Sequence, residues 1–251
     1  MTAPLYLREE PLDGLPDGTP LVLDGDEGRH AATVRRTQPG ERVDVADGAG
    51  RVARCEVVSV APGRLDLRVL QVEQVAQRVP ALVLVQALAK GGRDELAVET
   101  ATELGVDAVV PWQAARSVVV WAGERGERSR RKWQGVARAA AKQSRRATVP
   151  EVDQAVSSAG LAGLVAQAVA ADGAALVLHE DAELALADVA LPAAGRLLVV
   201  VGPEGGIGDA ELAGLTGAGA VAVRLGPEVL RTSSAGAAAL AVLSVRLHRW
   251  T

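Results

Sequence analysis

The chain has 251 residues, a formal net charge of −4 and 49% hydrophobic residues. This length accommodates one large or two small domains with well-buried cores. No apolar run reaches the roughly 18 residues that a membrane-spanning helix needs, and the first ten residues lack a signal-peptide pattern, so we expect a cytoplasmic protein without a membrane partner. The single cysteine, Cys55, excludes an intrachain disulfide and a multi-cysteine zinc site, and we expect no metal.

Alternating apolar and polar residues characterise the first seventy or so residues. The turn signals Asp47-Gly48 and Pro62-Gly63 separate the alternating stretches, as in an all-β unit. The strand positions are Val43, Val45, the run Arg51–Val60, Leu65, Leu67 and Val69. The pattern predicts a small β-barrel over residues 1–72, with Cys55 buried in a strand. The charged stretch Gln71–Arg78, which ends at Pro80, is the predicted linker.

Apolar runs separated by helical segments begin at Ala81 and predict a parallel α/β sheet, in a second domain over residues 80–251. The expected strands are Ala81–Ala87, Val106–Pro111, Leu176–His179, Leu197–Gly202 and Ala220–Leu225. The expected helices are Asp94–Leu104, Ser129–Ser144, Leu161–Val169, Asp209–Leu215 and Ser233–Arg249.

Two glycine-rich turns follow predicted strands of this domain. One is Gly-Pro-Glu-Gly-Gly at 202–206, and the other is Leu225-Gly226, followed by Leu230-Arg231-Thr232. Because glycine has no Cβ, the backbone of such turns can approach a bound small molecule closely. Since both turns end strands, we expect them to share one pocket. Neither has the spacing of a phosphate-binding motif, so a nucleoside triphosphate is not expected.

These two segments resemble the strand ends of the ribosomal RNA small subunit methyltransferase E family, which belongs to the SPOUT class of methyltransferases. That family carries GPEGG and LG-x-x-[IV]-LRT at these positions. Further blocks match in the same order along nearly the whole chain, and several blocks in register are far more specific than one GPEGG. They are Lys90 with Glu103-Leu104-Gly105-Val106, Pro111 with Arg116-Ser117, Lys132-Trp133 with Gln143-Ser144, Val149-Pro150, and Leu178-His179-Glu180.

The resemblance implies a fold for each domain. The first should be a PUA-like β-barrel that docks the surrounding RNA. Its pattern is matched by His30, Val34-Arg35-Arg36 and Asp47-Gly48-Ala49-Gly50, with Arg35 in place of the usual Leu. The second should be a trefoil-knotted methyltransferase domain, an exception to the rule that chains do not thread loops. In the family this domain dimerises beside its pocket. A homodimer agrees with the broadly apolar last helix, which a core position would also explain.

The resemblance also implies an activity. Like the 16S rRNA (uracil(1498)-N(3))-methyltransferases, the protein would use S-adenosylmethionine to methylate N3 of a uridine in 16S ribosomal RNA of the small ribosomal subunit. The cofactor carries an activated methyl group, so the protein has to position the acceptor and exclude water. The expected cofactor-binding residues are Leu178, His179, Glu180, Gly202, Pro203, Glu204, Gly205, Leu225, Gly226 and Leu230.

Local structure explains some polar residues of these segments without a ligand. A strand-end histidine is more often structural than catalytic, so His179 and Glu180 are assigned to the pocket wall. Glu211 fits a capping box with Gly208 as the N-cap residue, and it receives no chemical role. Glu204 has no local explanation in the sequence, so we expect it to serve the positively charged cofactor or its ribose.

A basic segment is the predicted RNA contact, despite the net negative charge. Between Arg116 and Arg146 lie ten Lys or Arg residues and two acidic residues. At helical spacing Arg131, Arg138, Lys142 and Arg145 fall on one side, and Trp133, Val136, Ala137 and Ala140 on the other. A solvated helix face would look the same, but the resemblance favours phosphate contacts. Lys90, Arg93 and Arg116 are expected to hold the uridine and its phosphates.

Arg231 is the catalytic candidate, because it follows the last predicted strand and would lie over the methyl group of the cofactor. A salt bridge within its loop is the alternative. The family usually has Glu where this chain has Ser233 and Lys where it has Thr100, so the general base is not identified.

Two other functions are compatible with the sequence. One is a SPOUT enzyme that methylates a ribose 2′-hydroxyl or transfer RNA, and product analysis would distinguish it. The other is a non-catalytic RNA-binding assembly factor, which would bind RNA without affinity for the cofactor. The pair of glycine-rich strand ends counts against the second.

Overall fold

The computed structural model describes residues 3–250 and divides the chain into two compact units. The first unit contains the residues up to Gln77 together with Ala141–Val149, and the second contains Arg78–Ala140 and the residues from Pro150 onward. The predicted domain limits at residues 1 and 251 lie outside the described residues. The predicted domain boundary is corrected for Ala141–Val149, because the prediction placed this segment in the second domain and it belongs to the first unit.

Apolar burial explains this correction. Ala147 and Val149 pack against a buried cluster of the first unit, which consists of Leu5, Leu7, Ala46 and Val52. The backbone N–H of Val149 also donates a 2.9 Å hydrogen bond to the carbonyl of Gly48. Such a long-range contact leaves no periodic signal in the sequence of either segment.

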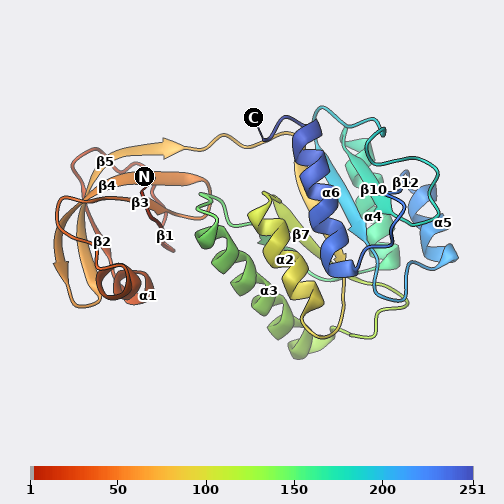
Figure 1. Ribbon diagram of the computed structural model, residues 1–251, viewed down its shortest axis with the longest axis horizontal. Coiled ribbons are helices and arrows are strands. Elements are labelled where there is room, and N and C mark those ends of the chain that lie inside the picture. Colours follow the sequence, from red (N-terminus) through yellow and green to blue (C-terminus); the bar gives the residue numbers. More distant parts are fainter. Residues whose placement is uncertain (1–2, 251) are drawn as a thin grey trace. The chain divides into compact units, whose positions relative to one another are not determined.

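A five-stranded sheet in the order β1-β3-β4-β5-β2 forms most of the first unit (Figure 1). Cys55 is 1% exposed in this sheet, as predicted, and burial raises the pKa of its thiol to about 12. The sheet consists of β1 (Leu5–Leu7), β2 (Pro20–Leu23), β3 (Arg42–Ala46), β4 (Arg51–Ala61) and β5 (Arg64–Gln74).

Two predictions for the first unit were wrong in detail. It is not all-β, because α1 (Gly25–Arg29) and the π-helical turn η1 (His30–Val34) lie between β2 and β3. The predicted linker also began too early, since β5 continues to Gln74 by pairing with β4.

The second unit contains the predicted parallel sheet, with the order β12-β10-β11-β6-β7-β8 and β9 paired to β7. All of these strand pairs are parallel. The five strands expected from the sequence are present. The two short strands β8 and β9 were not predicted. The strands are β6 (Ala81–Ala87), β7 (Ala108–Gln113), β8 (Glu151–Val152), β9 (Val156–Ser157), β10 (Ala174–Leu178), β11 (Arg196–Val201) and β12 (Val221–Val223).

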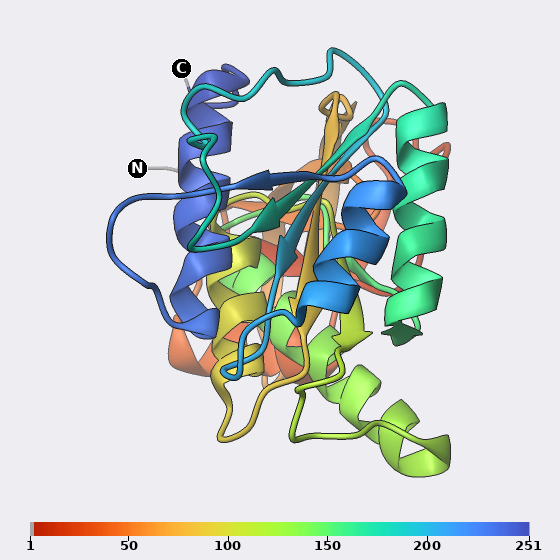
Figure 2. The same ribbon diagram turned by 90° about the vertical axis from the view of Figure 1, so that its right-hand side faces the viewer.

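Helices cover both faces of this sheet (Figure 2). Helices α2 and α6 lie on one face and α4 and α5 on the other. The helices of the second unit are α2 (Arg93–Glu103), α3 (Gly123–Gln143), α4 (Ser158–Ala170), α5 (Asp209–Gly217) and α6 (Thr232–Arg246). Helix α3 begins earlier than predicted, and α6 ends before the predicted Arg249. Within residues 3–250, none of the helices combines the length and apolar character needed to span a bilayer.

A buried hydroxyl group joins the start of α6 to two central strands. The side chain of Thr232 donates a 2.7 Å hydrogen bond to the carbonyl of Gly202, which follows β11. It accepts a 2.9 Å hydrogen bond from the amide of Gln86 on β6, whose side chain is fully buried. The contact fixes where the chain enters α6, next to the carboxyl ends of the parallel strands. Open parallel sheets bind their ligands at these ends.

We expect Thr232→Val to lower the free energy of unfolding by about 1 to 3 kcal/mol, because it removes the donor to the partly buried carbonyl of Gly202 and one of the two acceptors of the buried Gln86 amide at nearly constant volume. Urea denaturation measures the loss. Thr216→Val is the control, since the exposed Thr216 hydroxyl donates only to carbonyls of its own helix α5. Equal losses in the two variants would show that the Thr232 contact has no special role.

Candidate functional site

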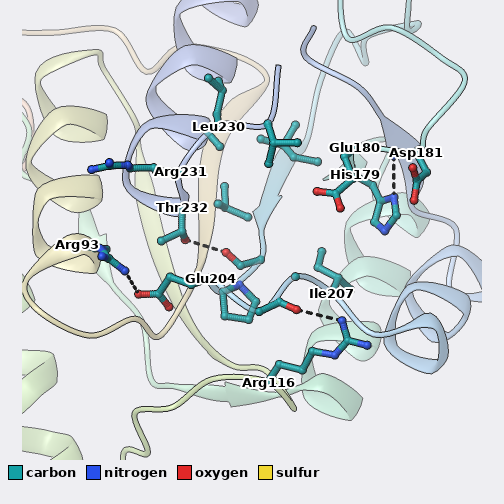
Figure 3. Close-up of a pocket in the computed structure, with 18 of the residues that line it drawn as sticks. Arg93, Arg116, His179, Glu180, Asp181, Glu204, Ile207, Leu230, Arg231 and Thr232 are labelled. Carbon is teal, nitrogen blue, oxygen red and sulfur yellow. Dashed lines mark hydrogen bonds and ion pairs between the residues drawn. The ribbon is translucent and has the colours of Figure 1, made fainter. Parts of the chain in front are cut away.

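A cavity of about 730 Å³ lies where β10 and β11 end and α6 begins (Figure 3). The second unit alone supplies its walls. The lining residues are Arg93, Arg116, Leu178, His179, Glu180, Asp181, Val201, Gly202, Pro203, Glu204, Gly205, Gly206, Ile207, Asp209, Val229, Leu230, Arg231, Thr232 and Ala235. The cavity therefore contains the first glycine-rich turn and the Leu-Arg-Thr sequence that follows the second.

Most of the predicted cofactor-binding residues line this cavity. Leu225 and Gly226 instead line a smaller neighbouring cavity of about 80 Å³. The two cavities share Leu178, His179, Glu180, Val229, Leu230 and Ala235 as lining residues. The two glycine-rich turns therefore line adjacent cavities with a common wall, and not the single pocket that the sequence predicted.

The glycines of the first turn are needed for packing as much as for ligand approach. A Cβ on Gly202 would lie 2.7 Å from Cγ1 of Ile207, and one on Gly205 would lie 3.2 Å from Cβ of Arg116. Gly206 has a φ of +73°, in the left-handed region that favours glycine. A Cβ on Gly226 would meet only a carboxylate oxygen of Glu228 at 3.6 Å. Among the glycines of the two turns, Gly226 is therefore the one that faces open space where a Cβ would be.

Glu204 has a local partner that the sequence did not reveal. Its carboxylate accepts a 2.8 Å hydrogen bond from the guanidinium of Arg93 on α2 (Figure 3). Burial alone would raise the pKa of this carboxyl, but backbone N–H groups of Glu204 and Lys90 and the Arg93 side chain hold the pKa below its ordinary value. Glu204 is therefore an ionised member of an ion pair. Lys90 approaches it through its backbone and does not line the cavity.

Arg116 also contacts the first glycine-rich turn. It donates a 3.0 Å hydrogen bond to the carbonyl of Gly205 from the loop after β7 (Figure 3). Both Arg93 and Arg116, predicted as RNA contacts, thus have partners within the protein and still reach the cavity.

Glu211 holds the loop of Arg116 in place. Its carboxylate accepts hydrogen bonds from the backbone N–H of Ala115 at 2.8 Å and from the hydroxyl of Ser158 at 2.5 Å. Its other oxygen accepts the backbone N–H of Gly208 at 3.3 Å, so the Glu211 half of a capping box is present, while Gly208 has no side chain for the other half. One carboxylate therefore joins the start of α5, the start of α4 and the loop after β7. The sequence indicated only the capping part of this role.

Arg231 differs from the other two arginines of the cavity. It is the N-cap residue of α6, and its side chain is exposed. Among residues 3–250 its guanidinium has no hydrogen-bond or ion-pair partner, so the loop salt bridge considered from the sequence is not formed. The positive end of the α6 dipole lies at the same place and adds to the local positive potential.

His179 makes local contacts at the cavity wall. Its backbone N–H donates a 3.0 Å hydrogen bond to the carbonyl of Val223, and its Nδ1 accepts the backbone N–H of Asp181 at 3.3 Å. These contacts agree with a wall position. In the described part of the chain, no group of three His, Cys, Asp or Glu side chains gathers as a metal site would require.

The basic face of α3 is only partly as predicted. Trp133, Ala137 and Ala140 are buried on the opposite side, and Arg131 is exposed. Lys142 forms a 2.8 Å ion pair with Glu27. Arg145 does not lie on this helix face, because α3 ends at Gln143 and Arg145 has a φ of +56°. The side chain of Arg138 is half-buried and has interactions of its own.

Two described protein families match the chain. The RNA methyltransferase domain family matches residues 77–244, and the RNA methyltransferase PUA domain family matches residues 23–70. The first match falls largely in the second unit, which contains the cavity. The second match falls in the first unit.

Proteins named ribosomal RNA small subunit methyltransferase E are similar to the chain over nearly its full length. The protein of Mycobacterium tuberculosis is 53% identical over 240 residues, 95% of this chain and 92% of that protein. The protein of Bacillus subtilis is 32% identical over 243 residues, 95% of each chain. The crystal structure of the Neisseria gonorrhoeae protein bound to S-adenosyl methionine has a TM-score of 0.84 and 27% identity, and the match covers 98% of each chain.

We expect Glu211→Ala to lower the free energy of unfolding by about 2 kcal/mol, because the substitution leaves two backbone N–H groups and one hydroxyl without their charged acceptor. Chemical denaturation measures this change. Glu183→Ala removes an exposed carboxylate with no hydrogen bond among the described residues and should change stability by less than about 0.5 kcal/mol. A Glu211→Ala variant as stable as Glu183→Ala would contradict the role of Glu211.

Proposed function

The chain belongs to the ribosomal RNA small subunit methyltransferase E family, and we propose that it methylates N3 of a uridine in 16S ribosomal RNA of the small ribosomal subunit, at the site of the uracil 1498 type. S-adenosylmethionine is the cofactor in this proposal, as in the Neisseria gonorrhoeae structure. The observation that carries it is the cavity of about 730 Å³, which gathers residues of both family-specific segments around the exposed guanidinium of Arg231.

The cavity has the features that S-adenosylmethionine requires. The first glycine-rich turn and the residues Leu178 to Glu180 line it, and the space beside Gly226 is open. The carboxylates of Glu180, Asp181 and Asp209 line the same cavity and would attract a positively charged ligand. The bound cofactor supplies a methyl group made electrophilic by its sulfonium centre. Gly202, Glu204, Leu225 and Leu230 complete the proposed binding set.

Arg231 is the residue that we assign to the acceptor. N3 of uracil carries a proton at neutral pH and becomes nucleophilic as that proton leaves. An unpaired guanidinium at a helix N-terminus favours the anionic form of a nearby base, because an opposite charge lowers the pKa of an acid. Arg93 and Arg116, each fixed by one protein contact, have further N–H groups for the phosphates of the uridine.

The family resemblance supports further structural parts of the proposal. The second unit is proposed to be a trefoil-knotted SPOUT domain, and the sheet of the first unit a PUA-like β-barrel. A homodimer is supported by the exposed side chains of Leu96, Val242 and Val245 on α2 and α6, which lie together on one face of the sheet. Because its proposed substrate is the ribosome, we propose a cytoplasmic location for the protein.

Analysis of the methylated product tests the function. Purified protein, S-adenosylmethionine and small subunits from a strain lacking the gene should yield one methylated uridine, which mass spectrometry of nuclease fragments locates. Methylation of a ribose 2′-hydroxyl or of transfer RNA would replace the proposal by another SPOUT activity. RNA binding without any methyl transfer would leave a non-catalytic assembly factor.

Gly226→Val should weaken the binding of S-adenosylmethionine at least tenfold, because the added methyl groups enter open space that the cofactor needs. The variant should unfold at the wild-type temperature, since a Cβ at this position has no close protein neighbour. Calorimetric titration measures the affinity. Gly214→Val, which also meets no atom within 4 Å, is the control outside the cavity. Unchanged affinity in folded Gly226→Val would overturn the placement of the cofactor.

Arg231→Ala should retain cofactor affinity but lose most of its turnover, about 100-fold or more, as expected when a charge that stabilises the transition state is removed. The wild-type rate should rise with pH as the imide ionises, and the variant should need a higher pH for the same rate. Single-turnover kinetics across pH measure both effects. A variant with near-normal turnover, or a flat wild-type profile, would assign the proton to another group.

A further inference from the structure

The carboxylate of Glu204 joins two segments that are distant in the sequence. It extends from the first glycine-rich turn to the loop of residues 88–92, which connects β6 to α2. There it accepts a hydrogen bond from the backbone N–H of Lys90 and the 2.8 Å hydrogen bond from the guanidinium of Arg93, the first residue of α2. Glu204 and Arg93 are 111 residues apart in the sequence. One side chain therefore holds the loop against the turn.

The loop of residues 88–92 depends on such contacts for its shape. Gly91 and Gly92 have φ values of +69° and +75°, and a Cβ on either would meet no atom within 4 Å. They therefore serve the course of the backbone and not close packing, and glycine is costly to order because it loses the most conformational freedom. From α2, Asp94 holds the start of the loop, since its carboxylate accepts the backbone N–H of Ala89 at 3.3 Å. Glu204 holds the part beside the cavity.

The turn that carries Glu204 is anchored without help from this loop. On one side of Glu204, the carbonyl of Gly202 accepts the 2.7 Å hydrogen bond from Thr232. On the other side, the carbonyl of Gly205 accepts the 3.0 Å hydrogen bond from Arg116. The turn is thus a fixed base, from which the carboxylate determines where the loop lies.

Charged side chains divide the cavity into a basic and an acidic side. Arg93 and Arg231 lie on one side of it, and Glu180 and Asp181 lie on the other (Figure 3). The carboxylate of Glu204 points to Arg93, and its donors are the guanidinium and the backbone N–H groups of Lys90 and of Glu204 itself. The acidic side chains that face a cationic cofactor are therefore those of the opposite wall.

We propose that Glu204 is a positioning residue for the methyl transfer: its carboxylate fixes Arg93 and the loop of residues 88–92 on the side of the cavity that receives the uridine, while its backbone stays in the cofactor wall. This inference rests on the proposed function. The side chain of Arg93 is 43% exposed, so without the ion pair solvent would let it leave the cavity. A guanidinium has five N–H donors, and the pair leaves most of them for phosphate oxygens.

Glu204→Gln tests the role of the carboxylate at nearly constant size. The amide has one acceptor oxygen in place of two and adds two donors, so it cannot hold Lys90 and Arg93 as the carboxylate does. Single-turnover methyl transfer should fall about tenfold, as expected for one lost hydrogen bond to a charged group. Because the loss of a negative charge by itself strengthens RNA binding, the rate is measured at saturating RNA and S-adenosylmethionine.

Two further measurements separate positioning from cofactor binding and from folding. Glu204→Gln should bind S-adenosylmethionine with wild-type affinity in calorimetry, which also shows that the variant is folded. Asp153→Asn is the matched control, because it makes the same chemical change in the 3.7 Å ion pair with Arg196, outside the cavity. The control should keep the wild-type rate. A wild-type rate in Glu204→Gln, or weaker cofactor binding in this variant, would refute the positioning role.

Arg93→Gln shows whether Glu204 acts through Arg93. If it does, the double variant Glu204→Gln/Arg93→Gln should be no slower than the slower of the two single variants, because both remove the same interaction. Losses that multiply, to about 100-fold for two tenfold effects, would show independent roles and overturn the proposal.

Failure of this inference is distinguishable from failure of the proposed function. If the wild type methylates the uridine and Glu204→Gln does so at the same rate, only the role of Glu204 is wrong. If the wild type transfers no methyl group to 16S ribosomal RNA, the proposed function itself is wrong.

Discussion

The cavity depends on one buried hydroxyl group, that of Thr232. Because this hydroxyl bonds both the carbonyl of Gly202 and the amide of Gln86, the first residue of α6 is fixed against the carboxyl ends of β11 and β6. The neighbouring residue Arg231 then occupies the cavity edge at the helix N-terminus. A small change in the entry of the chain into α6 would move the cationic side chain and the wall formed by Leu230 together. The place of the Arg231 side chain and the packing of the last helix are thus set by the same contact.

The cations of the protein divide by their partners. Arg93 and Arg116 stabilise the first glycine-rich turn, through Glu204 and the carbonyl of Gly205. Arg231 has no partner within residues 3–250, so its charge remains available to a ligand. The same division exists in the first unit, where arginines in ion pairs outnumber those without. A count of basic residues therefore overstates the surface available to RNA, and the pairing within the fold decides which charges remain.

Glycine has different physical roles at different positions of the two turns. Gly202 makes room for close packing, since a Cβ would lie 2.7 Å from Ile207 Cγ1, whereas Gly226 adjoins open space. The sequence predicted close ligand approach for the whole set. Only Gly226 and the left-handed Gly206 meet the local conditions for such a role, because at the other positions the atoms that exclude a Cβ belong to the protein itself.

Local pattern by itself determined the type and order of most elements, as strand alternation at Val43 and Val45 and the apolar run Ala81–Ala87 depend only on neighbouring residues. Motifs in register identified the family, which the comparisons confirmed, and placed Gly202 and Arg231 in one pocket. Tertiary structure alone decided which charged side chains pair with one another. It paired Glu204 with Arg93 and Lys142 with Glu27, and it left Arg231 without a partner among residues 3–250. It also assigned Ala141–Val149 to the first unit. These outcomes depend on atoms distant in sequence, whose approach is set by packing, and no local period records them.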